Sequence, residues 1–128
     1  MGTGYKGNSK YYRSIGQNVL IASSKYAYSN GRFGISSPST GNKTRNIISD
    51  DPLSTAKDFY DRITFGGIES IYDDGRICIT QMADGSVVTM RPVSSSPDGS
   101  PVVEINISGS LHTGGVKQQK IHFIGEGQ

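Results

Sequence analysis

Residues 87–91 read VVTMR, residues 102–107 VVEINI and residues 118–124 QQKIHFI. Apolar and polar residues alternate along all three segments, and a β-strand turns successive side chains to opposite faces of its sheet. One face is therefore predicted to be apolar, with Val88, Met90, Val103, Ile105, Ile107, Ile121 and Phe123. The opposite face is predicted to be polar, with Thr89, Arg91, Glu104, Asn106, Gln118, Lys120 and His122.

The polar face carries side chains that together suit acid–base chemistry at a phosphate. The solvated face of an antiparallel sheet usually mixes polar residues without a particular chemistry. This face has the carboxylate of Glu104, the imidazole of His122 and the cations of Arg91 and Lys120. They supply a base, an acid and positive charge for an anionic transition state without a metal. The alternative is a polar face that only keeps the domain soluble.

Length and composition predict a single domain, residues 1–128, with a modest core. Hydrophobic residues make up 34% of the chain and 17 residues are Gly, which favours a fold rich in loops. No apolar run is long enough to span a bilayer and no charged-then-apolar leader is present, so we expect neither membrane insertion nor export by this domain itself. The lone Cys78 is predicted to be a small buried hydrophobe.

The net charge of +2 conceals an asymmetry between the two parts of the chain. Residues 1–50, a Tyr- and Gly-rich leader, carry seven basic residues and one acidic residue, whereas residues 51–128 carry six basic and ten acidic residues. Basic side chains interleaved with aromatic rings suit a polyanion whose bases are unpaired. The alternative is that the leader packs its rings along the sheet. The rings in question are Tyr5, Tyr11, Tyr12, Tyr26 and Tyr28.

One helix is predicted at about residues 52–65. Asp51 is a cap candidate and Pro52 suits the first helical position, after which apolar residues recur at spacings of three and four. Lys57 with Asp61, and Asp58 with Arg62, form possible ion pairs one turn apart. In the leader, only residues 17–28 are apolar enough to form a strand or a short helix, and the rest is predicted to be irregular but packed.

Turn signals after the helix predict an antiparallel meander. Gly-containing turns at 73–75, 83–85, 97–101 and 108–115 separate strands predicted at 76–82, 86–92, 102–107 and 116–124. Nothing in the pattern requires a parallel crossover. The predicted fold class is α+β, with a helical or irregular N-terminal segment and one main helix on the apolar face of a four-stranded antiparallel sheet. The polar face is left open.

Several of these segments resemble a known group of proteins. Residues 83–96, 98–107 and 114–123, with the helix at 55–60 and the Gly66-Gly67 pair, resemble the C-terminal toxin domains of bacterial polymorphic toxins of the contact-dependent inhibition and Rhs types. Several such domains have the barnase/EndoU/colicin/RelE-like ribonuclease fold. The resemblance covers about residues 45–124, and it implies a helix packed on a sheet with catalytic residues that vary between members.

The resemblance implies metal-independent cleavage of RNA, often transfer RNA, by attack of a ribose 2′-hydroxyl on its own phosphate. Glu104 or His122 would be the base, and His122 is the better acid because its ordinary pKa lies near neutrality. Arg91 and Lys120 would hold the phosphate. The remaining polar residues of the face would orient the substrate or the catalytic side chains, namely Thr89, Asn106 and Gln118.

A second candidate site is the loop that contains His112. Thr113 and Lys117 flank glycines that let a backbone approach a phosphate, so both are candidate substrate-binding residues. The alternative is an exposed histidine without a function. Ser94-Ser95-Ser96 is interpreted as a strand end before a turn, because no nucleophile elbow surrounds it. No phosphate loop or zinc-site spacing is present, and we expect no cofactor and no metal.

Three classes of function remain open on the sequence. The preferred class is an endoribonuclease toxin, delivered as part of a larger effector and acting in the cytoplasm of a target cell. The alternatives are a toxin domain with DNase chemistry, for which a lone Glu104 is a poor metal-ligand set, and a nucleic-acid-binding or interaction module without catalysis. The expected partners are RNA and a cognate immunity protein that is acidic where it meets the basic leader or the site.

Overall fold

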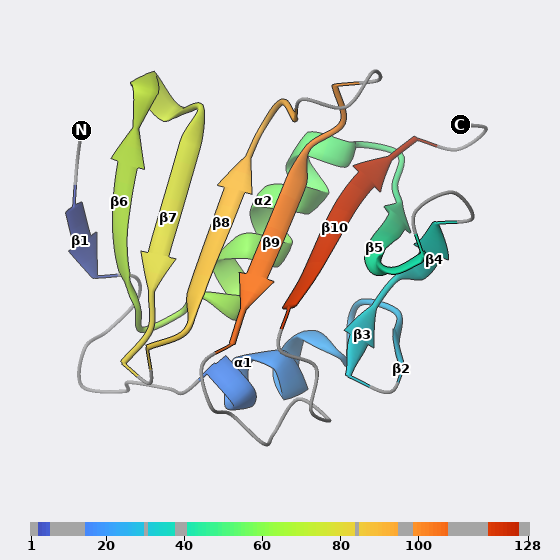
Figure 1. Ribbon diagram of the computed structural model, residues 1–128, viewed down its shortest axis with the longest axis horizontal. Coiled ribbons are helices and arrows are strands. Elements are labelled where there is room, and N and C mark those ends of the chain that lie inside the picture. Colours follow the sequence, from blue (N-terminus) through green and yellow to red (C-terminus); the bar gives the residue numbers. More distant parts are fainter. Residues whose placement is uncertain are drawn as a thin grey trace.

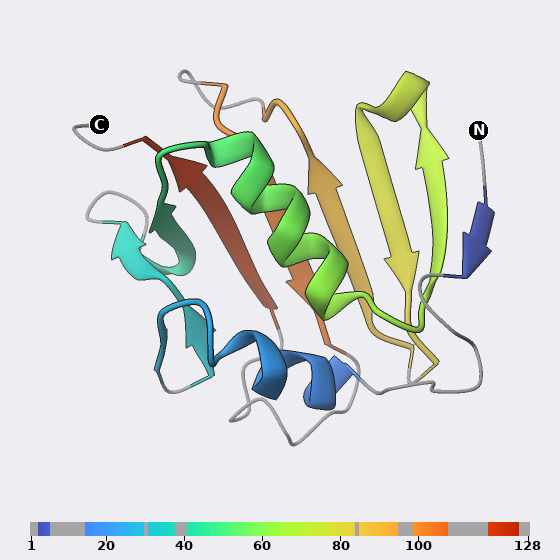
Figure 2. The ribbon, with the colours of Figure 1, turned by 180° about the vertical axis from the view of Figure 1, so that it is seen from behind.

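The computed structural model describes residues 3–5, 15–29, 31–37, 41–83, 85–94, 99–107 and 118–125. These residues form one large sheet, a small hairpin and two helices. Figure 2 shows helix α2 lying across one face of the sheet, with helix α1 near the C-terminal end of α2. The helices are α1 (Ile15–Ala22) and α2 (Pro52–Ile63). The strands of the large sheet are β1 (Thr3–Tyr5), β4 (Ile35–Ser37), β5 (Gly41–Ile48), β6 (Ile68–Tyr72), β7 (Ile77–Gln81), β8 (Val87–Arg91), β9 (Val102–Asn106) and β10 (Gln118–Ile124). The hairpin consists of β2 (Tyr28–Ser29) and β3 (Arg32–Phe33).

The strands of the large sheet lie in the order β1-β6-β7-β8-β9-β10-β5-β4 (Figure 1). Neighbouring strands are antiparallel except β10 and β5, which run parallel. β6 to β10 follow one another in sequence and in space. The four strands predicted from the turn signals are therefore confirmed as β7 to β10, with ends that agree within two residues.

The prediction of a four-stranded antiparallel sheet under one main helix is wrong. The described residues place eight strands in a mixed sheet, and a second helix, α1, resolves the strand-or-helix alternative within residues 17–28. The extra strands at the β10 edge come from the leader, which was predicted to be irregular. The expectation that no parallel pairing was needed is also wrong, because β5 pairs with β10 in parallel. Pairing between strands so far apart in the chain depends on tertiary contacts, which local alternation does not encode.

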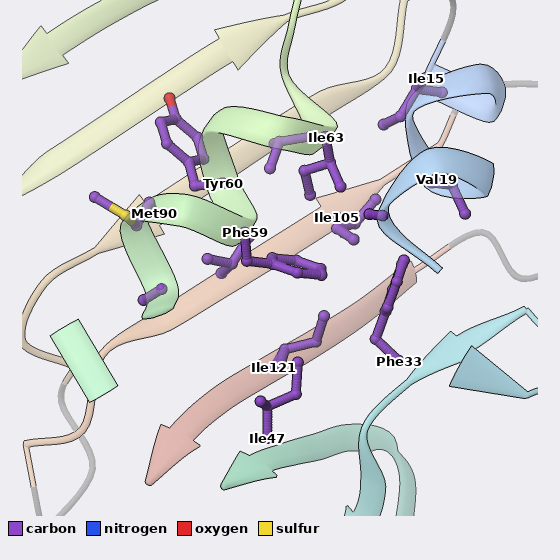
Figure 3. Packing of buried hydrophobic residues seen from close by; sticks show 14 of the residues in the cluster. Ile15, Val19, Phe33, Ile47, Phe59, Tyr60, Ile63, Met90, Ile105 and Ile121 are labelled. Atoms are coloured by element: carbon purple, nitrogen blue, oxygen red, sulfur yellow. The ribbon is translucent and has the colours of Figure 1, made fainter. Parts of the chain in front are cut away.

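Helix α2 forms where the sequence predicted a helix. The Asp51 side chain accepts a hydrogen bond from the Ser54 backbone N–H at 3.2 Å, and Pro52 occupies the first turn. Phe59, Tyr60 and Ile63 are buried against the sheet, and Figure 3 shows Phe59 and Ile63 near Ile105 and Ile121 and Tyr60 near Met90. The helix ends at Ile63, slightly earlier than predicted.

The predicted alternation of the last three strands is confirmed. The apolar-face residues are buried under α2, and Cys78 is buried with them as expected. A line of aromatic rings continues this core toward the leader, with ring centroids 4.8 Å apart for Phe33 and Phe59 and 5.5 Å apart for Phe59 and Phe123. Tyr26 and Tyr28 pack against the same cluster. The structure thus supports the alternative interpretation for Tyr26 and Tyr28, in which the rings of the leader pack within the fold.

Two polar side chains attach the leader to the sheet. Gln119 is buried on the helix side of β10, where its Oε1 accepts from the Phe33 N–H at 3.0 Å and its Nε2 donates to the Gly31 carbonyl at 2.9 Å. Arg45 on β5 donates from its guanidinium to the carbonyls of Phe33 (3.0 Å) and Gly34 (2.7 Å). Arg45, a basic residue of the leader, therefore stabilises the fold through these hydrogen bonds.

Gly34 is expected to be needed for this attachment. Its φ is +71°, and a Cβ there would overlap the carbonyl oxygen of Asn46, whereas Gly75 has a φ of +90° with open space around it. We expect Gly34→Ala to lower the free energy of unfolding by about 2–4 kcal/mol, since strain and crowding add. Gly75→Ala should lower it by only about 1–2 kcal/mol. Urea denaturation measures both, and equal losses would contradict the close approach of Gly34 to β5.

An ion cluster joins the segment that follows α1 to α2. The Asp58 carboxylate accepts from Arg62 at 2.8 Å, from Lys25 at 3.1 Å and from the Tyr26 hydroxyl. The predicted pair of Asp58 with Arg62 is thus confirmed. Burial raises the pKa of Asp58, but the hydrogen bonds from Arg62, Tyr26 and Lys25 outweigh it and hold that pKa at about 2. Burial, together with the neighbouring carboxylate, raises the pKa of Tyr26.

This cluster predicts a pH-dependent contribution to stability. Because the pKa of Asp58 is lower in the folded chain than its ordinary 3.8, its contribution is present above about pH 4 and is lost as the pH falls toward 2. We expect Asp58→Asn to have a lower melting temperature than the wild type at pH 7. The difference should shrink below pH 4 and disappear near pH 2. A constant difference over this range, followed by circular dichroism, would show that Asp58 does not act through its charge.

Candidate functional site on the open face of the sheet

The polar face of the sheet lies opposite the helices and faces the viewer in Figure 1. Strand register places the side chains of this face in rows that cross β8, β9 and β10. In one row, Glu104 lies between Thr89 and Lys120, each directly opposite it on a neighbouring strand. In the next row, Val102 lies between Arg91 and His122. Four residues predicted to be catalytic therefore occupy two adjacent rows.

Glu104 is at the centre of this cluster. An Arg91 guanidinium nitrogen lies 3.1 Å from Glu104 Oε1, and the two side chains are 38% and 26% exposed. Lys120 is directly opposite Glu104, a relation that places Cβ atoms about 4.5–5.5 Å apart. His122 is a diagonal neighbour of Glu104, for which the separation is about 7–8 Å. Arg91 and Lys120 thus adjoin Glu104, and His122 lies on the same face one row further along the strands.

The ring of His122 is oriented by a serine that the sequence did not single out. Its Nδ1 lies 2.9 Å from Ser100 Oγ, and Ser100 is buried. The backbone around Ser100 is itself held, since the Ser94 N–H donates to the Ser100 carbonyl at 3.2 Å and the Phe123 N–H donates to the Pro101 carbonyl at 2.9 Å. Only the turn signals of residues 97–101 were visible in the sequence, and turn composition does not reveal a side-chain partner on another strand.

The leader also contributes to this face. β5 places Thr44 beside Lys120 and Asn46 beside His122. Both side chains are partly exposed, and they extend the polar surface beyond β10. Sequence reasoning missed them because their position depends on the parallel pairing of β5 with β10. Asn46 adjoins His122 in strand register and Ser100 adjoins it by a hydrogen bond.

The remaining predicted residues divide into two groups. Asn106 and Gln118 are exposed and lie directly opposite each other, two residues along their strands from the charged cluster. Thr113 and Lys117, with the alternative candidate His112, lie outside the described residues, as do Ser95 and Ser96. Ser94 is buried. The glycine loop thus stays a prediction.

The described residues do not gather a metal-ligand set. Within the described ranges, no three His, Cys, Asp or Glu side chains lie close enough together to hold an ion. Neither of the two helices described here has the length and apolarity needed to cross a bilayer.

Comparisons with family models, with curated proteins and with solved structures yield no match to this chain. The resemblance to toxin domains is therefore still a prediction, and the function must be argued from the geometry of the site.

The ion pair on this face is expected to contribute little to stability. Pairs between partly exposed side chains contribute about 0–1 kcal/mol, because water solvates the separated charges well. We expect Arg91→Met and Glu104→Gln each to change the free energy of unfolding by less than about 1 kcal/mol. Urea denaturation tests this expectation. A loss of several kcal/mol would instead identify the pair as part of the structural framework.

Proposed function

We propose that this domain is a metal-independent endoribonuclease toxin that cleaves transfer RNA or another cellular RNA. The observation that carries the proposal is the grouping of Glu104, His122, Arg91 and Lys120 on one open face of three adjacent strands. A general base, a general acid and two cations are the groups that transesterification of a phosphodiester needs. The resemblance to polymorphic toxin domains supports the same chemistry.

The reaction is an attack by a ribose 2′-hydroxyl on the adjacent phosphorus. Glu104 removes the proton of the 2′-hydroxyl as the new O–P bond forms, and His122 donates a proton to the 5′-oxygen as the old P–O bond breaks. The products are a 2′,3′-cyclic phosphate and a free 5′-hydroxyl. Attacking and leaving oxygens stand on opposite sides of the phosphorus, so a base and an acid in diagonal register suit the two proton transfers.

The cations serve the charge that develops on the phosphate oxygens. Arg91 can offer two parallel N–H donors to the phosphate, and Lys120 acts as a compact charge directly across from Glu104. Before substrate binds, the ion pair with Glu104 keeps the Arg91 side chain over the site. Thr89, Asn106 and Gln118 supply hydrogen-bonding groups for the ribose and the neighbouring nucleotides.

The biological setting follows from the same proposal. A ribonuclease toxin of this type is delivered as part of a larger effector, acts in the cytoplasm of the target cell and is neutralised in the producing cell by an immunity protein. The site carries two cations near one carboxylate, so an inhibitor that covers it should present acidic side chains.

One observation favours a second candidate, a nucleic-acid-binding module without catalysis. The Glu104 carboxylate is already engaged by Arg91, which is what a solvated polar face would also display. The two candidates differ in whether RNA is cut when metal is removed.

The decisive residue for catalysis is expected to be His122. Incubation of the purified domain with total RNA in EDTA should produce fragments with 2′,3′-cyclic ends. His122→Ala should reduce the cleavage rate by about a hundredfold or more, since acid–base catalysis contributes roughly 10²–10⁴. Glu104→Gln and Arg91→Ala should each reduce it strongly, and combining His122→Ala with Glu104→Gln should cost less than the product of the two effects.

The matched control is Lys57→Ala, which removes a cation from the exposed surface of α2 on the other side of the sheet. It should cut RNA at the wild-type rate. A folded His122→Ala protein that cleaves as fast as the wild type would transfer the proposed role to the loop that contains His112. Binding of RNA without any cleavage would favour the non-catalytic module.

A further inference from the structure

The open face continues past the charged cluster onto β7 and β6, where Ile68, Tyr72, Ile77 and Ile79 are apolar and Ser70 and Gln81 are polar. Ile79 lies directly opposite Thr89, and Ile77 lies directly opposite Tyr72. Cys78 and Thr80, between these isoleucines along β7, are buried on the helix side. Ile77 and Ile79 therefore turn away from the core and lie on the same face as the candidate site.

This surface is unusual for the solvated face of an antiparallel sheet, which normally carries polar side chains. Tyr72 and Ile68 are each 40% exposed, and Ile77 and Ile79 are partly exposed. Adjacent apolar side chains left at a surface often mark a binding site. A flat β-surface with one aromatic ring suits a flat apolar ligand.

The position of this surface identifies the ligand as a base of the same nucleic acid. The pairing of Cys78 with Met90 places Ile77 beside Arg91 on the open face, and Tyr72 lies one strand further. Neighbouring strands are about 4.8 Å apart, so Tyr72 is about 10 Å from Arg91 across the sheet. That distance is comparable with the reach of a nucleotide from its phosphate to its base.

Charge around the apolar surface favours the same orientation. The turn after β6 carries Asp73 and Asp74, both exposed, directly next to Tyr72. Asp73 lies 3.8 Å from Arg76, so this turn carries one net negative charge, which disfavours a phosphate at this end of the sheet but does not repel an uncharged base. The sugar–phosphate backbone is therefore favoured over β8 to β10, near Arg91 and Lys120, with a base directed toward β6 and β7. The same carboxylates disfavour an anionic lipid surface.

A base can lie on this surface only if it is unpaired. In an RNA duplex the bases are stacked inside, and proteins reach mainly the ribose and phosphate groups. Unpaired bases can turn outward and stack on aromatic side chains, with a contribution of about 1–3 kcal/mol per base.

We propose that Tyr72, Ile77 and Ile79 form a subsite for an unpaired base next to the scissile phosphate, so that the substrate class is single-stranded RNA, as in a loop or a tail. This inference rests on the proposed ribonuclease function. Tyr72 stacks on the base, and the two isoleucines form the floor on which the base lies. The apolar residues on β6 and β7 then give specificity for single strands, and the charged residues on β8 to β10 cleave the bond.

The test uses a DNA oligonucleotide with one ribonucleotide, so that one phosphate can be cleaved, and a matched oligonucleotide with an abasic neighbour on each side. We expect loss of the bases to lower kcat/KM of the wild type about tenfold. Tyr72→Ala should lower kcat/KM about tenfold on the complete oligonucleotide and have no further effect on the abasic one. Tyr72→Phe should behave as the wild type, because it keeps the ring.

The matched control is Leu53→Ala, which removes an apolar side chain of similar exposure, 39%, from α2. It should change neither substrate's kcat/KM. If the wild type cleaves and Tyr72→Ala cleaves the complete oligonucleotide as fast as the wild type does, or if a duplex is cleaved as fast as a single strand, the subsite is overturned while the ribonuclease function stands.

A wild type that cleaves no RNA overturns the proposed function, and the subsite is then judged by binding. Titration of the ¹⁵N-labelled domain with a thymidine oligonucleotide should shift the amide signals of Tyr72, Ile77 and Ile79. Signals that do not move would overturn the subsite. A surface that bound only a protein partner would leave these signals unchanged.

Discussion

The two-sided pairing of β10 is the constraint on which the rest of the structure depends. This strand lies between β9 and β5, and it sends Gln119, Ile121 and Phe123 into the core while Lys120 and His122 face outward. A slip of one residue in its register would exchange the two sets, burying a cation and an imidazole and exposing an aromatic ring. Burial of Ile121 and Phe123 beneath α2 therefore fixes where the polar side chains of the site stand.

The leader has two functions in this arrangement. It extends the sheet beside β10, where it is held by hydrogen bonds of Gln119 with Phe33 and Gly31 and of Arg45 with Phe33 and Gly34. It also extends the open face through Thr44 and Asn46. Part of the basic and aromatic character of residues 1–50 is thus used for packing, as Arg45, Tyr26 and Tyr28 illustrate. The charge asymmetry alone therefore overstates the surface available to a polyanion.

The open face divides into a charged half on β8 to β10 and an apolar half on β6 and β7. Helix α2 covers the other side of β8 to β10 and holds these strands in place, whereas β6 and β7 extend beyond it (Figure 2). Ser100 is the clearest positioning contact, since it is buried and contacts a ring that faces the site. Side chains on the outer face of the sheet can therefore change with little effect on the core. Substitution of Arg91 or Glu104, for example, is expected to change the free energy of unfolding only slightly.

The sequence by itself determined the local features of this protein. Asp51 and Pro52 marked the start of α2, glycine turns marked β7 to β10, and period-two alternation separated Ile121 and Phe123 from Lys120 and His122, because each signal acts within a few residues. Only the tertiary structure decided that β5 pairs in parallel with β10, that Ser100 contacts His122, and that the open face becomes apolar at Tyr72. The first two of these relations join residues 76 and 22 positions apart. They depend on which surfaces pack best once the chain is collapsed, a choice that no local pattern records.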